Sequence, residues 1–399
     1  MNTTNKAASK PAYLPRTLFT DPGARAFIAP QRYIQGPGVL DSLGRYLSLT
    51  PATHAGLFMS AGGVERFAKR LNASLTSAEI KADLLVFAGE CSLTEIDKQV
   101  AAIQATTIDV LVAVGGGKCV DAAKAIAYRL GVPLVVVPSL ASNDAPTSAV
   151  SVLYSDDGVM AGAEFYPENP VFVLVDTAII ASAPERYLVA GMGDAMATWY
   201  EAATCLSNPA ARNVLGTRPT LAATAIGETC ARTLFEQGVA AAAAVRDGAV
   251  TQALEDIVEA NTLLSGIGFE SGGLAGAHAV AQAFTQLQHV EENFLHGEMV
   301  AMGTLTHLLL DQRLDEARRV AAFFVAVGLP VHLGQLAVDA ADADVLEALA
   351  KVALGSGLLA NIPRPVDAVA VMAALRSAHE IGHELTAASG SSAYDRLHS

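Results

Sequence analysis

Residues 109–121 read DVLVAVGGGKCVD, an apolar run that leads directly into three glycines. Asp109–Val114 has the composition of a buried strand, and a helical pattern begins at Asp121. Glycines let the backbone approach a phosphate closely, and the free N–H groups of a helix N-terminus attract anions. The spacing matches neither the G-x-x-x-x-G-K-[ST] loop nor the G-x-G-x-x-G fingerprint. The stretch therefore predicts a strand, a phosphate-binding turn and a helix, with a merely tight connection as the alternative.

The same alternation of apolar and helix-like segments continues on both sides of this stretch. The other candidate strands are Gly56–Ser60, Leu84–Ala88, Leu134–Pro138 and Val171–Asp176. The helical patterns between them are Gly63–Leu71, Leu93–Ala105 and Asp121–Leu130. Nearly all-aliphatic strands alternating with helices predict an open α/β sheet that is covered by helices on both faces.

Beyond Pro184 the pattern changes to long segments rich in Ala and Leu. These segments are Ala210–Phe235, Ala240–Ser265 and Met299–Val327. We therefore predict a Rossmann-like α/β domain at residues 27–183 and an all-α domain at residues 184–399, after a flexible extension at residues 1–26. The cleft between two such domains is the expected ligand site.

Composition limits the possible partners. A net charge of −14 argues against nucleic acid, whose phosphates would be repelled. The four cysteines have no C-x-x-C spacing, which favours a reducing compartment. The uncharged stretch Val320–Val338 contains Gly328 and Pro330, so a buried helix ending near Gly328 is expected and not a membrane span. The sequence thus predicts a cytoplasmic protein without membrane contact.

Three separate segments carry residues of the types that bind metals. They are Gly191–Ala195 with Asp194, Gly272–His278 with His278, and His296–Glu298 with His296. One carboxylate and two imidazoles would leave coordination positions open for a substrate, as in catalytic zinc sites. No local spacing joins the three residues, and single histidines often have other roles. The residues alone therefore leave the metal site open.

Six strings, taken in order, resemble the glycerol dehydrogenases of the metal-dependent, iron-containing-type alcohol dehydrogenase superfamily. They are YIQGPG (Tyr33–Gly38), GECS (Gly89–Ser92), GGGKxxDxAK (Gly115–Lys124), SNDAPTSAVSV (Ser142–Val152), AGMGDA (Ala190–Ala195) and LHGExVAxGTL (Leu295–Leu305). The resemblance implies an α/β domain plus an all-α domain, the architecture that this superfamily shares with dehydroquinate synthase.

The resemblance also implies roles for individual residues. Asp194, His278 and His296 match the metal ligands, and with Asp144, which matches the residue that contacts the polyol, they form the implied catalytic set. The positions that match the dinucleotide site are Gly116, Gly117, Lys118, Cys119, Asp121, Ser139, Ser142, Ser148, Val150 and Tyr154. An Asx-turn before Pro146 is the structural alternative for Asp144.

The implied reaction is hydride transfer from a metal-bound secondary hydroxyl of glycerol, or of a related small polyol, to NAD, which gives dihydroxyacetone. Iron-type relatives have a fourth ligand, a histidine, one helical turn after the aspartate, where this chain has Thr198. Three ligands favour Zn²⁺ over Fe²⁺. The acidic residue that usually selects NAD is replaced by Ser60-Ala61-Gly62, which leaves NADP open. The family resemblance further implies a homo-oligomer, often an octamer.

Two other functions are compatible with parts of the sequence. A dehydroquinate-synthase-like lyase also combines NAD, a metal and this fold, but the neutral to acidic loop SNDAPTS lacks the basic residues for its anionic substrate. A dehydrogenase for another small hydroxy compound is the closer alternative. His379–His383 fits the H-E-x-x-H pattern of zinc hydrolases, for which a solvated helix face is the simpler interpretation.

Overall fold

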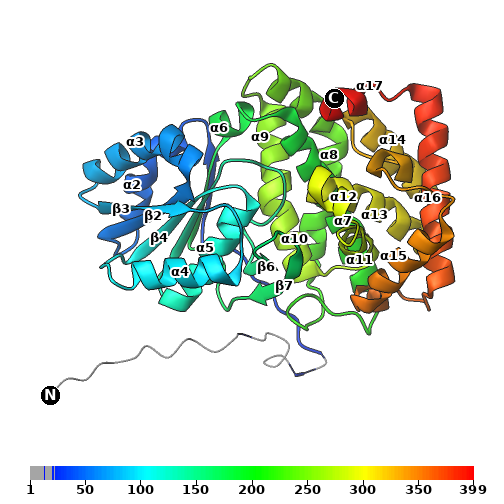
Figure 1. Cartoon of the computed structure of the whole chain (residues 1–399), viewed down its shortest axis with the longest axis horizontal. Helices are drawn as coiled ribbons and strands as arrows, with labels where there is room; N and C mark the ends of the chain where they lie inside the picture. The colour runs from blue at the N-terminus through cyan, green and yellow to red at the C-terminus, as the bar shows by residue number, and fades with distance from the viewer. Residues whose placement is uncertain (1–12, 14–19, 22) are drawn as a thin grey trace.

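Six parallel strands form the centre of the N-terminal part of the chain (Figure 1). The computed structural model describes Tyr13, residues 20–21 and residues 23–399. The strand order is β1-β8-β5-β4-β2-β3. The strands are β1 (Tyr33–Gly36), β2 (His54–Ser60), β3 (Lys81–Phe87), β4 (Val110–Gly115), β5 (Leu134–Pro138) and β8 (Phe172–Asp176). All five strands expected from the sequence are present, which confirms the predicted α/β sheet.

Both faces of this sheet are buried, which explains why its strands are almost entirely aliphatic. Leu57, Val112 and Leu174 point into one apolar cluster, and their neighbours along the strands, such as Phe58 and Ala113, point into another. Helices α2 (Leu43–Leu47) and α3 (Ala61–Ser77) lie on one side, and α4 (Leu93–Ile103) and α5 (Gly117–Leu130) on the other (Figure 1). The short helices η1 (Val39–Ser42) and α6 (Thr177–Ala181) complete this part.

The connections between strands reverse direction between β2 and β4. The chain runs outward from β2 to β3, returns past β2 to β4, and then continues to β5 on the other side. Met59 and Val114 are paired across these two strands, so Ser60 and the glycine loop emerge next to each other at the same edge of the sheet. Ligands of open α/β sheets bind at this kind of reversal.

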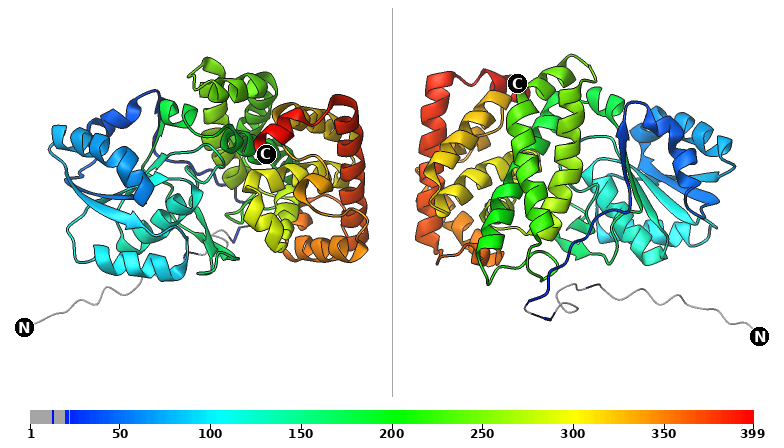
Figure 2. Two further views of the ribbon diagram at one scale, coloured as in Figure 1. Left: turned by 45° about the horizontal axis from the view of Figure 1, so that its top comes forward. Right: turned by 180° about the vertical axis from the view of Figure 1, so that it is seen from behind.

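Residues after Pro184 form the predicted helical part, which lies beside the sheet (Figure 2). Its long helices are α7 (Glu185–Ser207), α8 (Leu221–Arg246), α9 (Gln252–Glu259), α10 (Ser265–Gly272), α11 (Gly276–Phe284), α12 (Gln288–Asn293), α13 (His296–Leu310), α14 (Leu314–Val327), α15 (Ala343–Gly355), α16 (Ala368–Ser389) and α17 (Ser392–His398). A π-helical turn, η2 (Ala260–Leu264), joins α9 to α10, and the 3-10 turns η3 (Leu333–Leu336) and η4 (Leu358–Asn361) connect the later helices.

Each of the three long segments expected to be helical is interrupted. Residues 208–220 form a loop, so the first helix begins at Leu221. Residues 247–251 separate α8 from α9, and Asp311–Arg313 separates α13 from α14. Composition alone does not locate such breaks, because Ala and Leu also occur in helix-flanking loops. The helix expected to end near Gly328 does so, since Gly328 is its left-handed C-cap with φ 96°.

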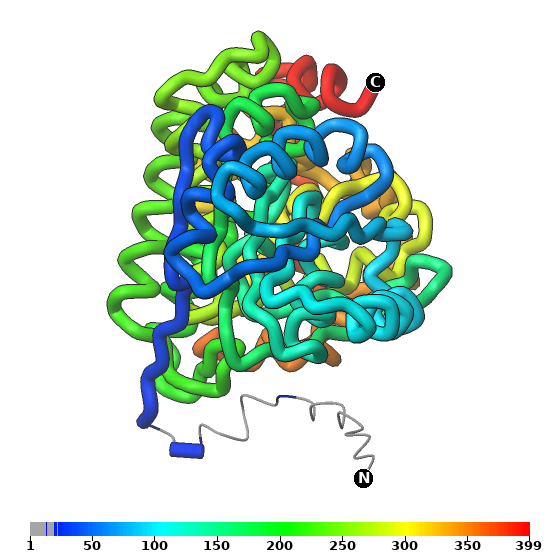
Figure 3. Tube along the Cα trace, turned by 90° about the vertical axis from the view of Figure 1, so that its left-hand side faces the viewer, coloured from blue at the N-terminus to red at the C-terminus, as the bar shows by residue number. Residues whose placement is uncertain are grey.

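Three strands were not expected from the sequence. β1 is an edge strand, and β6 (Val150–Tyr154) with β7 (Met160–Phe165) forms a separate antiparallel hairpin. β1 joins the sheet to the helical part, because the Tyr33 hydroxyl lies 2.8 Å from Thr262 Oγ1 and Gln35 Nε2 donates to Glu255 Oε2 across 2.6 Å. Figure 3 shows this dark-blue segment running alongside the green helices.

The predicted extension at residues 1–26 falls largely outside the described residues, which lack 1–12, 14–19 and 22. The predicted division into residues 27–183 and 184–399 stays a prediction. In the structure, the last strand ends at Asp176 and α7 begins at Glu185. Within the described part of the chain, every helix is too short or too polar to cross a membrane.

Candidate metal and cofactor site

The three predicted metal ligands come together from three helices. Asp194 lies in the middle of α7, His278 in the first turn of α11, and His296 is the first residue of α13. Their ligand atoms all lie within 4.8 Å of one another, and no other such cluster of His, Cys, Asp or Glu occurs among the described residues. Nε2 of His278 and Nε2 of His296 are each 3.5 Å from Asp194 Oδ1. Residues far apart in the sequence thus form one potential ligand set.

Close contact between α7 and α13 makes this convergence possible. A Cβ added to Gly297 would lie 1.7 Å from the carbonyl oxygen of Ala190, and one added to Gly193 would lie 2.3 Å from the carbonyl oxygen of Gly297. Only glycine permits two helix backbones to approach so closely. The GMGDA and HGE strings therefore bring the Asp194 and His296 side chains onto facing turns.

Glu201 orients His278. Its Oε2 is 2.6 Å from His278 Nδ1, and its Oε1 accepts hydrogen bonds from the backbone N–H groups of Ala275 and His278. Burial opposes protonation of His278, but the charges of Glu201 and Asp194 raise its pKa well above the usual value. A carboxylate beside Nδ1 holds a proton there and turns Nε2 toward Asp194. Glu201 was not among the predicted site residues, although it lies two helical turns after Asp194 and therefore on the same face of α7.

Glu298 holds the start of α13 in place. It accepts two hydrogen bonds from Arg186, at 2.7 Å each, and one from the backbone N–H of Leu295 at 2.8 Å. His398 Nε2 lies 3.0 Å from the same carboxylate. Because His296 lies between Leu295 and Glu298, this buried cluster fixes the helix turn that presents it.

The donor set fits a divalent metal. Asp194 Oδ1 is buried and has no hydrogen-bond partner in the described structure, which is costly for a carboxylate unless a cation occupies the space it faces. Burial opposes ionisation of Asp194, but the His278 and His296 imidazoles, each 3.5 Å from Oδ1, lower its pKa below the usual value. One ionised oxygen and two imidazole nitrogens form a typical three-residue ligand set with room for substrate.

Asp144 lies beside this cluster. Its backbone N–H donates to Asp194 Oδ2 across 3.3 Å, and its Oδ2 accepts a hydrogen bond of 2.8 Å from Ser265. Burial and the negative charge of Asp194 raise the pKa of Asp144 well above its ordinary value. Thr198, one turn after Asp194, lies 3.0 Å from the Ser265 hydroxyl. Ser265 thus links Thr198 to Asp144.

The glycine loop has the tight geometry expected of a backbone phosphate site. Gly116 is extended, with φ −86° and ψ −174°, and α5 begins directly after it. A Cβ on Gly115 would meet Cys119 at 2.7 Å, and one on Gly117 would meet the Asn143 side chain at 2.7 Å. Burial raises the pKa of Cys119 to about 12, so this thiol stays protonated. The loop leaves the first N–H groups of α5 available for an anion.

Several predicted cofactor residues also have structural partners. Lys124 Nζ, which is buried, donates to Asp121 Oδ1, the Ser148 hydroxyl and the Val150 carbonyl oxygen. Asp121 Oδ2 accepts from the Val152 N–H. These contacts attach the β6–β7 hairpin to α5.

Lys118, at the start of α5, lies close to Tyr154, at the end of β6. Lys118 Nζ lies 2.7 Å from Glu90 Oε2 and 4.5 Å from the centre of the Tyr154 ring. Glu90 belongs to the GECS string and Lys118 to the glycine string, so two matched strings meet here, and Tyr154 lies two residues after a third.

The loop after β5 connects the cofactor side to the metal side. Ser139 donates its N–H to the Gly115 carbonyl oxygen across 3.0 Å, and Ser142 is half-buried in the same loop. Further along, the Ala141 carbonyl oxygen accepts from Asn261, and a Cβ on Gly191 of α7 would lie 2.0 Å from that oxygen. The loop that carries Ser139, Ser142 and Asp144 thus spans from the glycine turn to α7.

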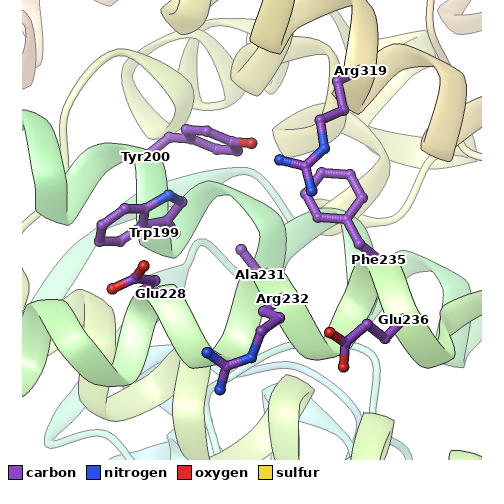
Figure 4. Close-up of a pocket in the computed structure, with 8 residues that line it drawn as sticks. All are labelled: Trp199, Tyr200, Glu228, Ala231, Arg232, Phe235, Glu236 and Arg319. Atoms are coloured by element: carbon purple, nitrogen blue, oxygen red, sulfur yellow. The ribbon is translucent and has the colours of Figure 1, made fainter.

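A hollow of about 250 Å³ lies elsewhere on the helical part (Figure 4). It is lined by Trp199, Tyr200, Glu228, Ala231, Arg232, Phe235, Glu236 and Arg319. The Arg319 guanidinium lies over the Phe235 ring at 4.0 Å. None of the lining residues belongs to the predicted metal or cofactor set, so this hollow is separate from the site.

The sheet, the helical part and the Asp-His-His cluster together define a metal-dependent dehydrogenase of two structural parts. Residues 34–184 match the model of the iron-containing alcohol dehydrogenase family. A glycerol dehydrogenase of Thermotoga maritima is 42% identical over 357 residues, which cover 89% of this chain and 97% of that protein. A glycolaldehyde reductase of Halobacterium salinarum is 36% identical, over 90% of this chain and 98% of that protein.

A solved structure supports the same family. The crystal structure of glycerol dehydrogenase from Schizosaccharomyces pombe aligns with a TM-score of 0.86 and 32% identity, over 92% of this chain and 93% of that chain. The chain belongs to the iron-containing alcohol dehydrogenase family, in the group of the glycerol dehydrogenases. It is an oxidoreductase, and its family implies NAD and a divalent metal as cofactors.

Proposed function

We propose that this enzyme oxidises the secondary hydroxyl of glycerol, or of a related small polyol, and passes the hydride to NAD to give dihydroxyacetone. The observation that carries the proposal is the convergence of Asp194, His278 and His296 on one point beside Asp144. The names of the relatives support the same substrate class.

The metal and the cofactor supply the chemistry that the side chains lack: the bound metal lowers the pKa of the substrate hydroxyl, and the nicotinamide accepts the hydride. The protein provides the arrangement. Glu201 keeps the His278 ring turned so that Nε2 faces Asp194, where a bound metal would take the place of the Nε2 proton, and Glu298 fixes the helix turn of His296. Burial of Asp194 excludes water from one side of the ligand set, which strengthens its electrostatic effect.

Asp144 is proposed to orient the substrate. Ser265 donates a hydrogen bond to Asp144 Oδ2, while Asp144 Oδ1 has no protein partner among the described residues. That oxygen is suited to accept a hydrogen bond from a hydroxyl adjacent to the reacting carbon. A substrate with neighbouring hydroxyls would use this contact, and a simple monohydric alcohol would not.

Zinc is the metal we propose. Where iron-type relatives have a fourth protein ligand, Thr198 directs its hydroxyl to Ser265. One carboxylate and two imidazoles are sufficient for a catalytic zinc site. Fe²⁺ is the alternative, and reconstitution of chelator-treated enzyme with each metal distinguishes the two.

The cofactor we propose is NAD, with NADP also accepted. Ser60 ends β2 beside the glycine loop, and its hydroxyl caps α3 by accepting from the Gly63 N–H at 3.2 Å. Ser60, Ala61 and Gly62 are exposed and carry no carboxylate that would repel a 2′-phosphate. The ten positions for which we propose dinucleotide contacts, from Gly116 to Tyr154, lie in the glycine loop and the start of α5, in the loop after β5 and in the β6–β7 hairpin.

The test is the appearance of reduced nicotinamide absorbance with glycerol, zinc and either NAD or NADP. Chelator-sensitive reduction with glycerol, 1,2-propanediol or 2,3-butanediol supports the proposal, and reduction of neither cofactor with any polyol contradicts it. Glycolaldehyde with reduced cofactor tests the neighbouring reductase activity. No observation favours a dehydroquinate-synthase-like lyase, since the relatives carry dehydrogenase and reductase names. Cytoplasmic location and a homo-oligomer, such as an octamer, stay predictions from the sequence.

A further inference from the structure

A second group of histidines lies in the helical part, away from the Asp194 cluster. His379 and His383 belong to the H-E-x-x-H pattern and lie one turn apart on α16, at the edge of the molecule opposite the sheet (Figure 1). His332, just before η3, faces both of them. The ring centroids of the three residues are 5.7, 5.8 and 6.0 Å apart, close to an equilateral triangle. The sequence did not indicate His332 as a partner of His379 and His383 in this histidine triad.

The backbone is built for this close approach. Gly382 lies within the H-E-x-x-H pattern, and a Cβ there would lie 1.8 Å from the carbonyl oxygen of Val331 and 3.1 Å from the N atom of His332. Glycine at this position therefore lets α16 contact the segment that carries His332. The contact places one imidazole opposite the two that share a helix face.

Two ring nitrogens of the triad are buried and lack hydrogen-bond partners. In the described structure, these two nitrogens are Nδ1 of His332 and Nδ1 of His379. A buried polar atom without a partner is unfavourable, and a bound ion or water is the usual explanation. The charges around the triad suit a cation, since Asp339 and Glu380 act electrostatically on His379.

The spacing is compatible with one ion held by three imidazoles. A zinc ion about 2.0 Å from each ring nitrogen separates the ring centroids by roughly 5 Å. The ring-centroid separations observed in the triad exceed this value by less than about 1 Å. In the described part of the chain only the Asp194 cluster has its ligand atoms within 4.8 Å of one another, so at least one ring of the triad must turn. His383 is exposed and free to do so.

We propose that His332, His379 and His383 form a second metal site, which binds a first-row divalent ion that prefers imidazole, such as Zn²⁺ or Ni²⁺. The ion connects α16 to the segment before η3 and stabilises the folded chain without taking part in hydride transfer. Hydrolysis is not part of the proposal.

Zinc titration of the metal-free full-length protein, followed by calorimetry, tests the proposal. The wild type should bind two equivalents per chain, His383→Ala should bind one and keep its polyol oxidation, and His278→Ala should bind one and lose it. The double variant with both changes should bind none. His289→Ala removes another exposed imidazole and should leave both equivalents.

Melting temperature provides a second readout that does not depend on activity. In the His278→Ala background, added Zn²⁺ should raise the melting temperature, because a ligand that binds only the folded state stabilises it. The rise should disappear when His383→Ala or His379→Ala is added. One zinc equivalent in the wild type that is lost in His278→Ala, or two equivalents in His383→Ala, would overturn the second site.

Discussion

Glu201 Oε2 lies 2.6 Å from His278 Nδ1, and the Glu201 carboxylate is completely buried. Its other oxygen accepts two backbone N–H groups at the start of α11. The single carboxylate therefore fixes both the ring and the helix turn of one proposed metal ligand. A carboxylate that orients a ligating histidine in this way contributes strongly to metal affinity.

Glu201→Gln should weaken metal binding about 10–100-fold, because an amide cannot accept all three hydrogen bonds and no longer favours the Nδ1 proton. The metal dissociation constant, measured by competition with a chelator, checks this. Glu316→Gln is the matched control, since Glu316 accepts a 2.8 Å hydrogen bond from Tyr200, a neighbour of Glu201 on α7. The prediction is wrong if both variants hold the metal as tightly as the wild type.

Gly297→Ala should lower stability on the order of 3 kcal/mol and release the metal, because the new methyl would lie 1.7 Å from the Ala190 carbonyl oxygen and push α13 from α7. Urea denaturation and metal analysis measure the two effects. Gly62→Ala is the control, as nothing lies within 4 Å of a Cβ there and alanine favours the helix. Equal stability of Gly297→Ala and wild type would argue against the close helix contact.

Ser60→Asp should reduce kcat/KM for NADP about tenfold or more and leave NAD turnover largely intact. A carboxylate at the end of β2 repels a 2′-phosphate, and aspartate still caps α3 in place of the serine hydroxyl. Steady-state kinetics with both cofactors provide the measurement, and Ser60→Asn is the uncharged control. Unchanged NADP kinetics in Ser60→Asp would show that the ribose binds elsewhere.

Glu270 should make the protein less stable as pH rises from about 5 to 8. Burial raises the pKa of Glu270 from 4.5 to about 7, although hydrogen bonds from the Ala149 N–H and Asn169 oppose the shift. Between those values the folded state keeps a proton that the unfolded state releases, so the stability present below pH 4.5 is lost as pH passes through 7. The loss is on the order of 3 kcal/mol.

Urea denaturation at pH 5 and pH 8 measures this loss. Glu270→Gln should show a smaller decrease in unfolding free energy between the two pH values than the wild type. An identical decrease in both proteins would assign the pH dependence to other groups.

The sheet was predictable because its strands are buried on both faces. Val110–Val114 and Leu134–Val137 are aliphatic at every position, and a buried parallel strand requires this composition. The β6–β7 hairpin was missed because Ser151, Gly158 and Gly162 interrupt its apolar pattern, and it is stabilised by Lys124 and Asp121 from another element. Local patterns carry no information on such long-range contacts.

The three proposed metal ligands could be predicted only through the resemblance. Asp194, His278 and His296 lie on three helices, and their meeting depends on Gly193 and Gly297, which permit the helix contact. Glu201 had a usable signal, since it shares a helix face with Asp194. The position of His332 opposite α16 had no signal in the sequence, because only the folded loop before η3 brings it there.

The most direct test of the central claim is polyol oxidation by chelator-treated enzyme to which zinc is returned, measured by reduced nicotinamide absorbance for the wild type and His278→Ala. We predict that zinc restores glycerol oxidation to the wild type and not to His278→Ala, while both proteins still bind the dinucleotide. Oxidation of glycerol by His278→Ala at the wild-type rate would contradict the assignment of Asp194, His278 and His296 as the catalytic metal site.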